Sequence, residues 1–152
     1  MTTIQRMFPP ARPAEVDEFE RSHGVTLPPE YRDFLLKSNG GRPADNLVNV
    51  PDFDEAAVNH FFGLQRGDMY DLRSEGARIE GRIPPGTIAI GDDPGGNLFL
   101  LSVDGDSNGA VFFWDHEDEP VDQPTDWSDF ENVYRIADGF DQFLAMLRPD
   151  QG

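Results

Sequence analysis

The segment DGDSNG, which begins at Asp104, carries the side chains most suited to holding a metal ion. Oxygen-bearing residues stand at its first, third and fifth positions, with Gly109 at the sixth and Asp115 at the twelfth. This is the spacing of an EF-hand calcium loop. However, the twelfth residue is Asp rather than the longer Glu, and the flanking residues are typical of strands rather than helices. A hairpin turn rich in Gly, Asp, Asn and Ser has the same composition, so we expect a turn without tight calcium binding.

Motifs for phosphate binding and catalysis are incomplete. Residues 92–97 (DDPGGN) lack both glycine-rich phosphate-loop spacings, and their two aspartates would repel phosphate, so a turn is predicted. His23, His60 and His116 have no metal-ligand spacing, no Ser lies in a G-x-S-x-G motif, and there is no Cys. The sequence does not exclude a carboxylate pair of the kind that hydrolyses glycosides, because any acidic chain contains candidate pairs. We predict no catalytic residue, no metal ligand and no cofactor, and therefore no enzyme. His60, amid apolar residues, should pack, and His116 should be solvated.

The charge of the chain is strongly negative and unevenly distributed. The formal net charge is −17. Residues 83–134 contain no Lys or Arg and carry −12, while the rest carries −5, from 12 basic and 17 acidic residues. Phosphate contacts need Lys and Arg, so nucleic acid is a poor partner and a basic protein or a cation is a better one. The alternative explanation is that the negative charge serves only to keep the protein soluble. The twelve carboxylates are those of Asp92, Asp93, Asp104, Asp106, Asp115, Glu117, Asp118, Glu119, Asp122, Asp126, Asp129 and Glu131.

The densest group of these carboxylates follows the apolar run 111–114, which suits an inner strand of a sheet. A rigid sheet would project the residues just beyond it towards a partner. Trp114, inside the run, should pack in the core. Trp127, set among Asp and Ser, is either a packed residue or an exposed aromatic anchor within an acidic rim, as in a binding hot spot. The predicted partner-binding residues are Asp115, Glu117, Asp118, Glu119, Asp122 and Trp127.

Two helices, over residues 13–23 and 29–38, are predicted to precede this region. The first begins with Pro13, whose missing N–H would be unpaired at a helix start anyway. It ends at Gly24, because glycine adopts the left-handed conformation readily. The second presents Tyr31, Phe34 and Leu35 on one face and ends at the pair Gly40-Gly41.

Strands are predicted between these helices and the C-terminus. Residues 97–103 and 110–114 should pair as adjacent antiparallel strands around a turn. Further candidate strands are 47–50, 58–64, 87–90 and 133–136, and 69–82 suggests a helix interrupted at Gly76.

The clearest amphipathic pattern is the last one, a helix over 138–147 with Asp138 as a plausible N-cap. The fold class that follows is α+β, with a mainly antiparallel central sheet, two N-terminal helices and one C-terminal helix. At this length a single domain over residues 1–152 is expected.

Apolar runs long enough for a membrane helix are absent from the sequence, and the first residues lack the apolar core of a signal peptide. We therefore expect a soluble cytoplasmic protein without a membrane partner.

A set of short motifs occurs in a fixed order along most of the chain. They are Phe19-Glu20, Gly24, Leu27-Pro28, Tyr31, Phe34-Leu35 and Asn39-Gly40-Gly41, then 88–92 (IAIGD), Gly95-Gly96-Asn97, 111–116 (VFFWDH) and 140–144 (FDQFL).

Taken together, these motifs resemble the SUKH superfamily, and more narrowly the branch that includes the yeast cell-wall assembly regulators. The resemblance implies a non-enzymatic α+β binding module. In bacteria such modules are often immunity proteins that neutralise a cognate toxin. The first hypothesis is therefore an immunity protein whose acidic surface binds a toxin, one that acts on nucleic acid. A regulatory scaffold or adaptor is the second, and a calcium-dependent module the weakest.

Overall fold

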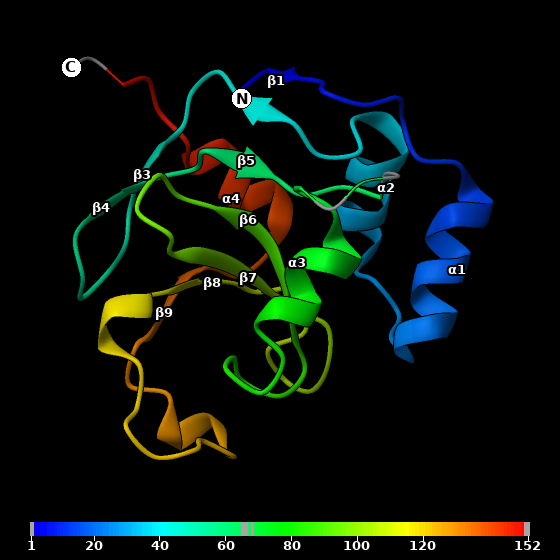
Figure 1. Cartoon of the computed structure of the whole chain (residues 1–152). Helices are drawn as coiled ribbons and strands as arrows, with labels where there is room; N and C mark the ends of the chain where they lie inside the picture. The colour runs from blue at the N-terminus through cyan, green and yellow to red at the C-terminus, as the bar shows by residue number, and fades with distance from the viewer. Residues whose placement is uncertain (1, 65–66, 68, 151–152) are drawn as a thin grey trace.

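A five-stranded antiparallel sheet forms the centre of the computed structural model, which describes residues 2–64, 67 and 69–150 (Figure 1). Its strands lie in chain order: β5 (His60–Phe61), β6 (Thr87–Asp92), β7 (Leu98–Ser102), β8 (Val111–Trp114) and β9 (Val133–Ala137). The predicted antiparallel pairing of 97–103 with 110–114 is confirmed as β7 with β8. As its apolar run indicates, β8 is an inner strand with neighbours on both sides. The α+β class is confirmed.

Two N-terminal helices occupy the predicted positions. Helix α1 (Pro13–His23) ends at Gly24, which has a φ of 65°, and α2 (Pro29–Lys37) also begins with proline. Glu20 joins them, because one of its carboxylate oxygens accepts the N–H of Leu27 at 2.7 Å and the other binds the guanidinium of Arg32 at 2.9 Å. The motif Phe19-Glu20 therefore fixes the angle between the two helices.

The other helices differ from the prediction in detail. Helix α4 (Phe140–Met146) begins after Gly139 rather than at Asp138. The carboxylate of Asp138 does not cap it, because that carboxylate pairs with Arg135 at 2.9 Å. The predicted interruption at Gly76 is wrong: α3 (Leu72–Arg78) runs through this residue. The N-cap Asp71 fixes the start of α3 by accepting the N–H of Arg73, and one glycine costs a helix only about 1 kcal/mol.

Four short strands form two small sheets beside the main one. Strand β1 (Ile4–Gln5) pairs with β2 (Arg42–Pro43), and β3 (Leu47–Asn49) pairs with β4 (Glu55–Ala57). The prediction of one strand over 58–64 is wrong, because the chain changes partners there. The N–H of Val58 donates to Asn46 beside β3, and that of Asn59 donates to Asp92 of β6.

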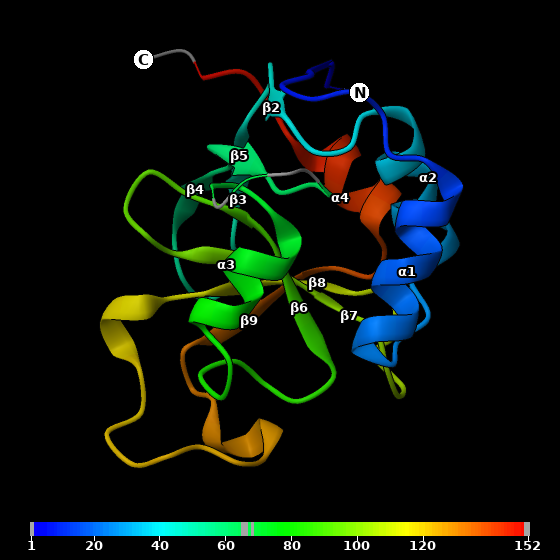
Figure 2. The same cartoon turned by 45° about the vertical axis from the view of Figure 1, so that its right-hand side comes forward.

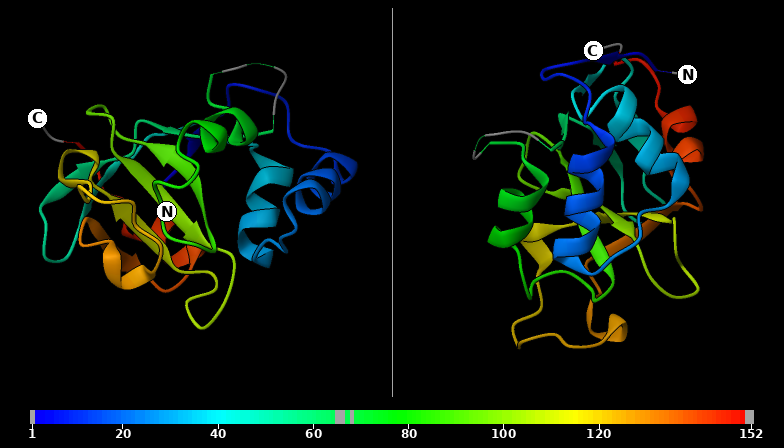
Figure 3. Two further views of the ribbon diagram at one scale, coloured as in Figure 1. Left: turned by 60° about the horizontal axis from the view of Figure 1, so that its bottom comes forward. Right: turned by 90° about the vertical axis from the view of Figure 1, so that its right-hand side faces the viewer.

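Helices cover both faces of the main sheet (Figures 1 and 3). On the face of α4 and α2, Phe143 packs against Phe99 with ring centroids 5.6 Å apart, and Phe140 packs against Phe34 at 4.9 Å. The opposite face carries Leu98, Phe112 and Trp114, and α3 lies across it. The described part of the chain contains no helix long and apolar enough to cross a membrane.

The motif Asn39-Gly40-Gly41 joins α2 to the segment after β5. The Asn39 amide donates to the carbonyls of Pro9 and Leu64 at 3.1 and 2.8 Å, and its oxygen accepts the N–H of Leu64 at 2.7 Å. Backbones approach so closely here that a Cβ on Gly63 would lie 2.1 Å from the Asn39 carbonyl oxygen. The residues of this motif therefore serve the fold.

Candidate functional site: an acidic segment and the pocket beside it

Residues 83–134 contain no Lys or Arg, and most of their twelve carboxylates lie in the connection from β8 to β9. We name residues 115–131 the acidic segment. It contains two short 3-10 helices, η1 (His116–Asp118) and η2 (Trp127–Asp129), and extends from one end of the molecule (Figures 1 and 2).

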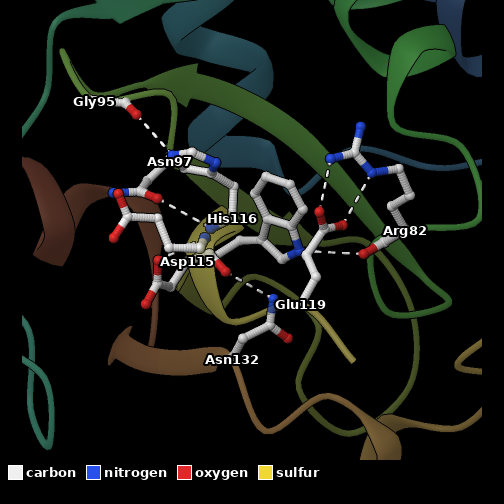
Figure 4. A network of polar contacts seen from close by, with 9 residues as sticks. Arg82, Gly95, Asn97, Asp115, His116, Glu119 and Asn132 are labelled. Carbon is white, nitrogen blue, oxygen red and sulfur yellow. Dashed lines mark hydrogen bonds and ion pairs between the residues drawn. The ribbon is translucent and has the colours of Figure 1, made fainter. Parts of the chain in front are cut away.

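The first part of the acidic segment is fixed by polar contacts on several sides (Figure 4). The N–H of His116 donates to the Asn97 side chain at 3.0 Å, and its ring Nε2 lies 2.8 Å from the carbonyl oxygen of Gly95. The Asn132 amide donates to the Asp115 carbonyl at 2.9 Å. His116 is thus half-buried and bonded to the turn between β6 and β7, so the expectation that it is solvated is wrong.

Arg82 holds the end of η1. Its guanidinium makes two hydrogen bonds of 2.9 Å with the Glu119 carboxylate, and its carbonyl accepts the indole N–H of Trp114 at 3.1 Å (Figure 4). Trp114 is 1% exposed, which confirms its predicted place in the core. The acidic segment is therefore attached to a rigid part of the sheet.

The predicted partner-binding carboxylates fall into two groups. Asp115 caps η1 by accepting the N–H of Glu117 at 3.0 Å, and Glu119 is bound to Arg82. Glu117, Asp118 and Asp122 are exposed, and no cation among the described residues pairs with them. These three are the ones available to a partner, and their role stays a prediction.

Trp127 has contacts within the fold. Its indole N–H donates to the carbonyl of Pro85 at 3.1 Å, and its ring lies 5.0 Å from that of Phe112, although 37% of the residue is exposed. Val121 is fully exposed and is a more accessible apolar contact. Sequence reasoning missed Val121. Its position as a lone apolar residue between Pro120 and Asp122 is the pattern that could have indicated its exposure.

The EF-hand spacing of Asp104 and Asp115 does not correspond to one site. Residues 104–109 form the turn between β7 and β8, and the hydroxyl of Ser107 in this turn lies 2.8 Å from that of Ser102 at the end of β7. Asp115 follows the far end of β8. Within the described ranges, no three His, Cys, Asp or Glu side chains converge as metal ligands would.

A pocket of about 430 Å³ lies between α3 and the acidic segment. The pairing register places His60, Asp92, Leu98 and Trp114 in one row across β5 to β8, and the last three of these line the pocket. A register shift between Ala89 and Gly91 alters the strand just before Asp92, as bulges beside functional sites often do. We name this hollow the Asp92 pocket.

The carboxylate of Asp92 is ionised only at a cost. Burial is the main cause that raises its pKa to about 6, and the nearby charges of Glu75 and Asp93 add to this effect. It accepts the N–H of His60 at 3.0 Å, and the ring Nδ1 of His60 lies 3.6 Å away. Burial and the charge of Arg42 lower the pKa of His60, so this ring supplies little positive charge near neutral pH.

A strained tyrosine shapes the pocket wall. Tyr70 has a φ of 61°, which is unusual for a residue other than glycine, and its ring stacks on His60 with centroids 3.9 Å apart. Its N–H donates to the Glu75 carboxylate at 3.1 Å. Strained backbone of this kind clusters at functional sites.

A second hollow, of about 530 Å³, lies on the other side of α3. Its lining is largely apolar and includes Leu72, Ile83, Ile88 and Phe130.

Comparison with known proteins adds two findings. Residues 10–146 match the SMI1 / KNR4 family (SUKH-1). The chain is also similar to the SPbeta prophage-derived uncharacterized protein YokK of Bacillus subtilis (strain 168). The two are 27% identical over 151 residues, which cover 88% of this chain and 72% of that protein.

Proposed function

The chain belongs to the SMI1/KNR4 family (SUKH-1), and from this premise we propose that it is an immunity protein, which binds a bacterial toxin and blocks it without chemistry. Family membership supports a role of the toxin-immunity or SMI1/KNR4 type in general. The similarity to a prophage-derived protein of Bacillus subtilis supports a bacterial setting. The proposed place of action is the cytoplasm, where a toxin that attacks nucleic acid would meet its target.

One observation carries the toxin-binding part of the proposal. Glu117, Asp118 and Asp122 are exposed beside residues that Arg82, Asn97 and Asn132 hold in place. A toxin that acts on nucleic acid needs a basic active site. A preorganised acidic surface would be steered to such a site and would occupy it in place of phosphate.

The acidic segment supports inhibition by occupation rather than by catalysis. Its carboxylates either hold the fold, as Asp115 and Glu119 do, or face solvent. We propose that the chain needs neither cofactor nor metal for this role.

The test is coexpression with a toxin encoded beside this gene. The proposal expects that the chain restores growth and forms a stable complex with the toxin. Reversal of Glu117, Asp118 and Asp122 to Lys should slow association by about tenfold or more and flatten its dependence on salt, because exposed charges act mainly on encounter. Glu119 is left unchanged, since a lysine there would face Arg82.

A matched control separates local from overall charge. Reversal of Asp33, Asp54 and Asp106 to Lys makes the same change in net charge on exposed residues of other elements. Wild-type association by the first variant, or equal slowing by both, would remove the acidic segment from the proposal. A chain that leaves the toxin active but retains another partner would favour the adaptor hypothesis.

A further inference from the structure

The Asp92 pocket combines a buried charge with aromatic walls. Trp114, Tyr70 and His116 line it together with the apolar side chains of Leu98 and Ile79. The acidic segment borders it through His116, which directly precedes the exposed Glu117 and Asp118 in the chain.

Among the described residues, no lysine or arginine pairs with Asp92. Two arginines also line the pocket, but Arg78 pairs with Glu75 at 2.9 Å and Arg82 pairs with Glu119 at 2.9 Å. In the described part of the chain, the charges that act on Asp92 most strongly are carboxylates. A half-buried carboxylate in this setting favours an incoming positive charge.

A second observation at the same place does not depend on charge. The side chain of His60 is 10% exposed, its ring Nδ1 faces the Asp92 carboxylate, and this nitrogen has no hydrogen-bond partner among the described residues. Buried polar atoms are nearly always hydrogen-bonded. This orphaned nitrogen lies 3.6 Å from the Asp92 carboxylate, so the polar contacts of the described residues are incomplete behind the pocket, which His60 itself does not line.

The walls distinguish between the two common cationic side chains. A guanidinium is planar, stacks on aromatic rings and binds carboxylates through two N–H groups, whereas an ammonium is a compact and strongly hydrated charge. The partly exposed rings of Tyr70 and His116 therefore fit arginine better than lysine, while the buried Trp114 ring already carries the Arg82 guanidinium 5.3 Å from its centroid.

We propose that the Asp92 pocket receives an arginine side chain of the protein partner, with Asp92 as its counter-ion and the neighbouring rings as its walls. This inference rests on the proposed function and names the anchor of the partner. The exposed Glu117 and Asp118 then guide a basic partner towards the pocket, and the pocket limits its dissociation. A desolvated charge pair acts on the dissociation rate, while exposed charges act on encounter.

The test uses N-acetyl-L-arginine methylamide as the probe and its citrulline analogue as the uncharged control. Binding to the full chain is followed by NMR at neutral pH, through the Trp114 indole N–H and the backbone N–H groups of His60 and Gly96. We expect saturable shifts of these signals with the arginine probe. The citrulline probe, and the arginine probe with Asp92→Asn, should bind about tenfold more weakly, as expected for loss of one close charge pair.

Two variants make the result interpretable. Asp92→Asn keeps an oxygen that can accept the N–H of His60, so the fold should persist, and its NMR spectrum checks this. Asp104→Asn makes the same charge change in the turn between β7 and β8, and should bind like the wild type. The proposal would be overturned if the arginine probe shifted only the backbone N–H signals of the exposed residues Glu117, Asp118 and Asp122, or if Asp92→Asn left binding unchanged.

A longer probe identifies the source of the arginine. A hexapeptide with one Arg flanked by Lys should bind more tightly than the blocked arginine, and Glu117→Gln with Asp118→Gln should remove that gain. Equal affinities of the hexapeptide and the blocked arginine would indicate that the pocket binds a free guanidinium compound, and would overturn the proposal of a protein partner. None of these assays contains a toxin, so their failure is distinct from failure of the chain to neutralise one.

Discussion

At the scale of single residues, the cost of an ionised Asp92 leads to a stability prediction. Replacement by Asn should raise the free energy of unfolding at neutral pH by about 1 kcal/mol. The change of the pKa from 3.8 to about 6 alone would give about 3 kcal/mol, but 22% of the side chain is exposed and water screens it. Urea unfolding of both proteins measures the difference.

The pH dependence gives this prediction its control. The folded pKa of Asp92 is raised, so the folded protein holds a proton that the unfolded chain releases between pH 3.8 and about 6. The wild type therefore loses stability relative to Asp92→Asn as the pH rises through this window. A difference that is constant with pH would show that Asp92 is not the titrating group.

Individual residues also show where sequence reasoning stops. The burial of Trp114 and the exposure of Glu117 follow from their neighbours in the chain. The bond between Arg82 and Glu119 spans 37 positions, and no local pattern contains it. Asp92 was placed in a turn, but it is the last residue of β6 and lines a pocket, because a register shift and the distant helix α3 decide its surroundings.

At the scale of elements, the contact between the end of α2 and the segment after β5 depends on one side chain. Asn39→Ala should lower the free energy of unfolding by about 3 kcal/mol, because it leaves the buried N–H of Leu64 and two carbonyls without their partner. Thermal and urea unfolding measure this loss. Asn108→Ala, an exposed asparagine in the turn after β7, should stay within about 0.5 kcal/mol of the wild type.

Elements were predictable where the chain itself marks their ends. Prolines and glycines set the bounds of α1 and α2, and two apolar runs around a turn gave β7 and β8. The change of sheet between Val58 and Asn59 was not readable, since it depends on Asn46 and Asp92, which are distant in sequence.

At the scale of the whole molecule, the net charge of −17 should make stability increase with salt. Eight arginines of the described residues already pair with carboxylates, so the remaining carboxylates mostly repel one another. Raising NaCl from about 10 to about 100 mM shortens the screening length from about 30 to about 10 Å. The melting temperature should rise by about 2–4 °C, as expected for about 1 kcal/mol.

Exposed ion pairs oppose this effect, because salt weakens them too. Each contributes little, in the range of about 0–1 kcal/mol, so repulsion should dominate. Calorimetry in NaCl and in NaClO₄ at equal ionic strength separates screening from specific anion effects. A melting temperature that falls with both salts would mean that the ion pairs outweigh the repulsion.

The two ends of the described chain have a practical consequence for handling this protein. Strand β1 near the N-terminus and the residues that follow α4 lie at one end of the molecule, and the acidic segment lies at the other (Figures 1 and 2). A tag, a fluorophore or a second protein joined at either end would therefore lie away from the acidic segment and the surface that it forms. Attachment to a biosensor chip through either end should leave that surface accessible in solution, and both orientations should give the same association rate.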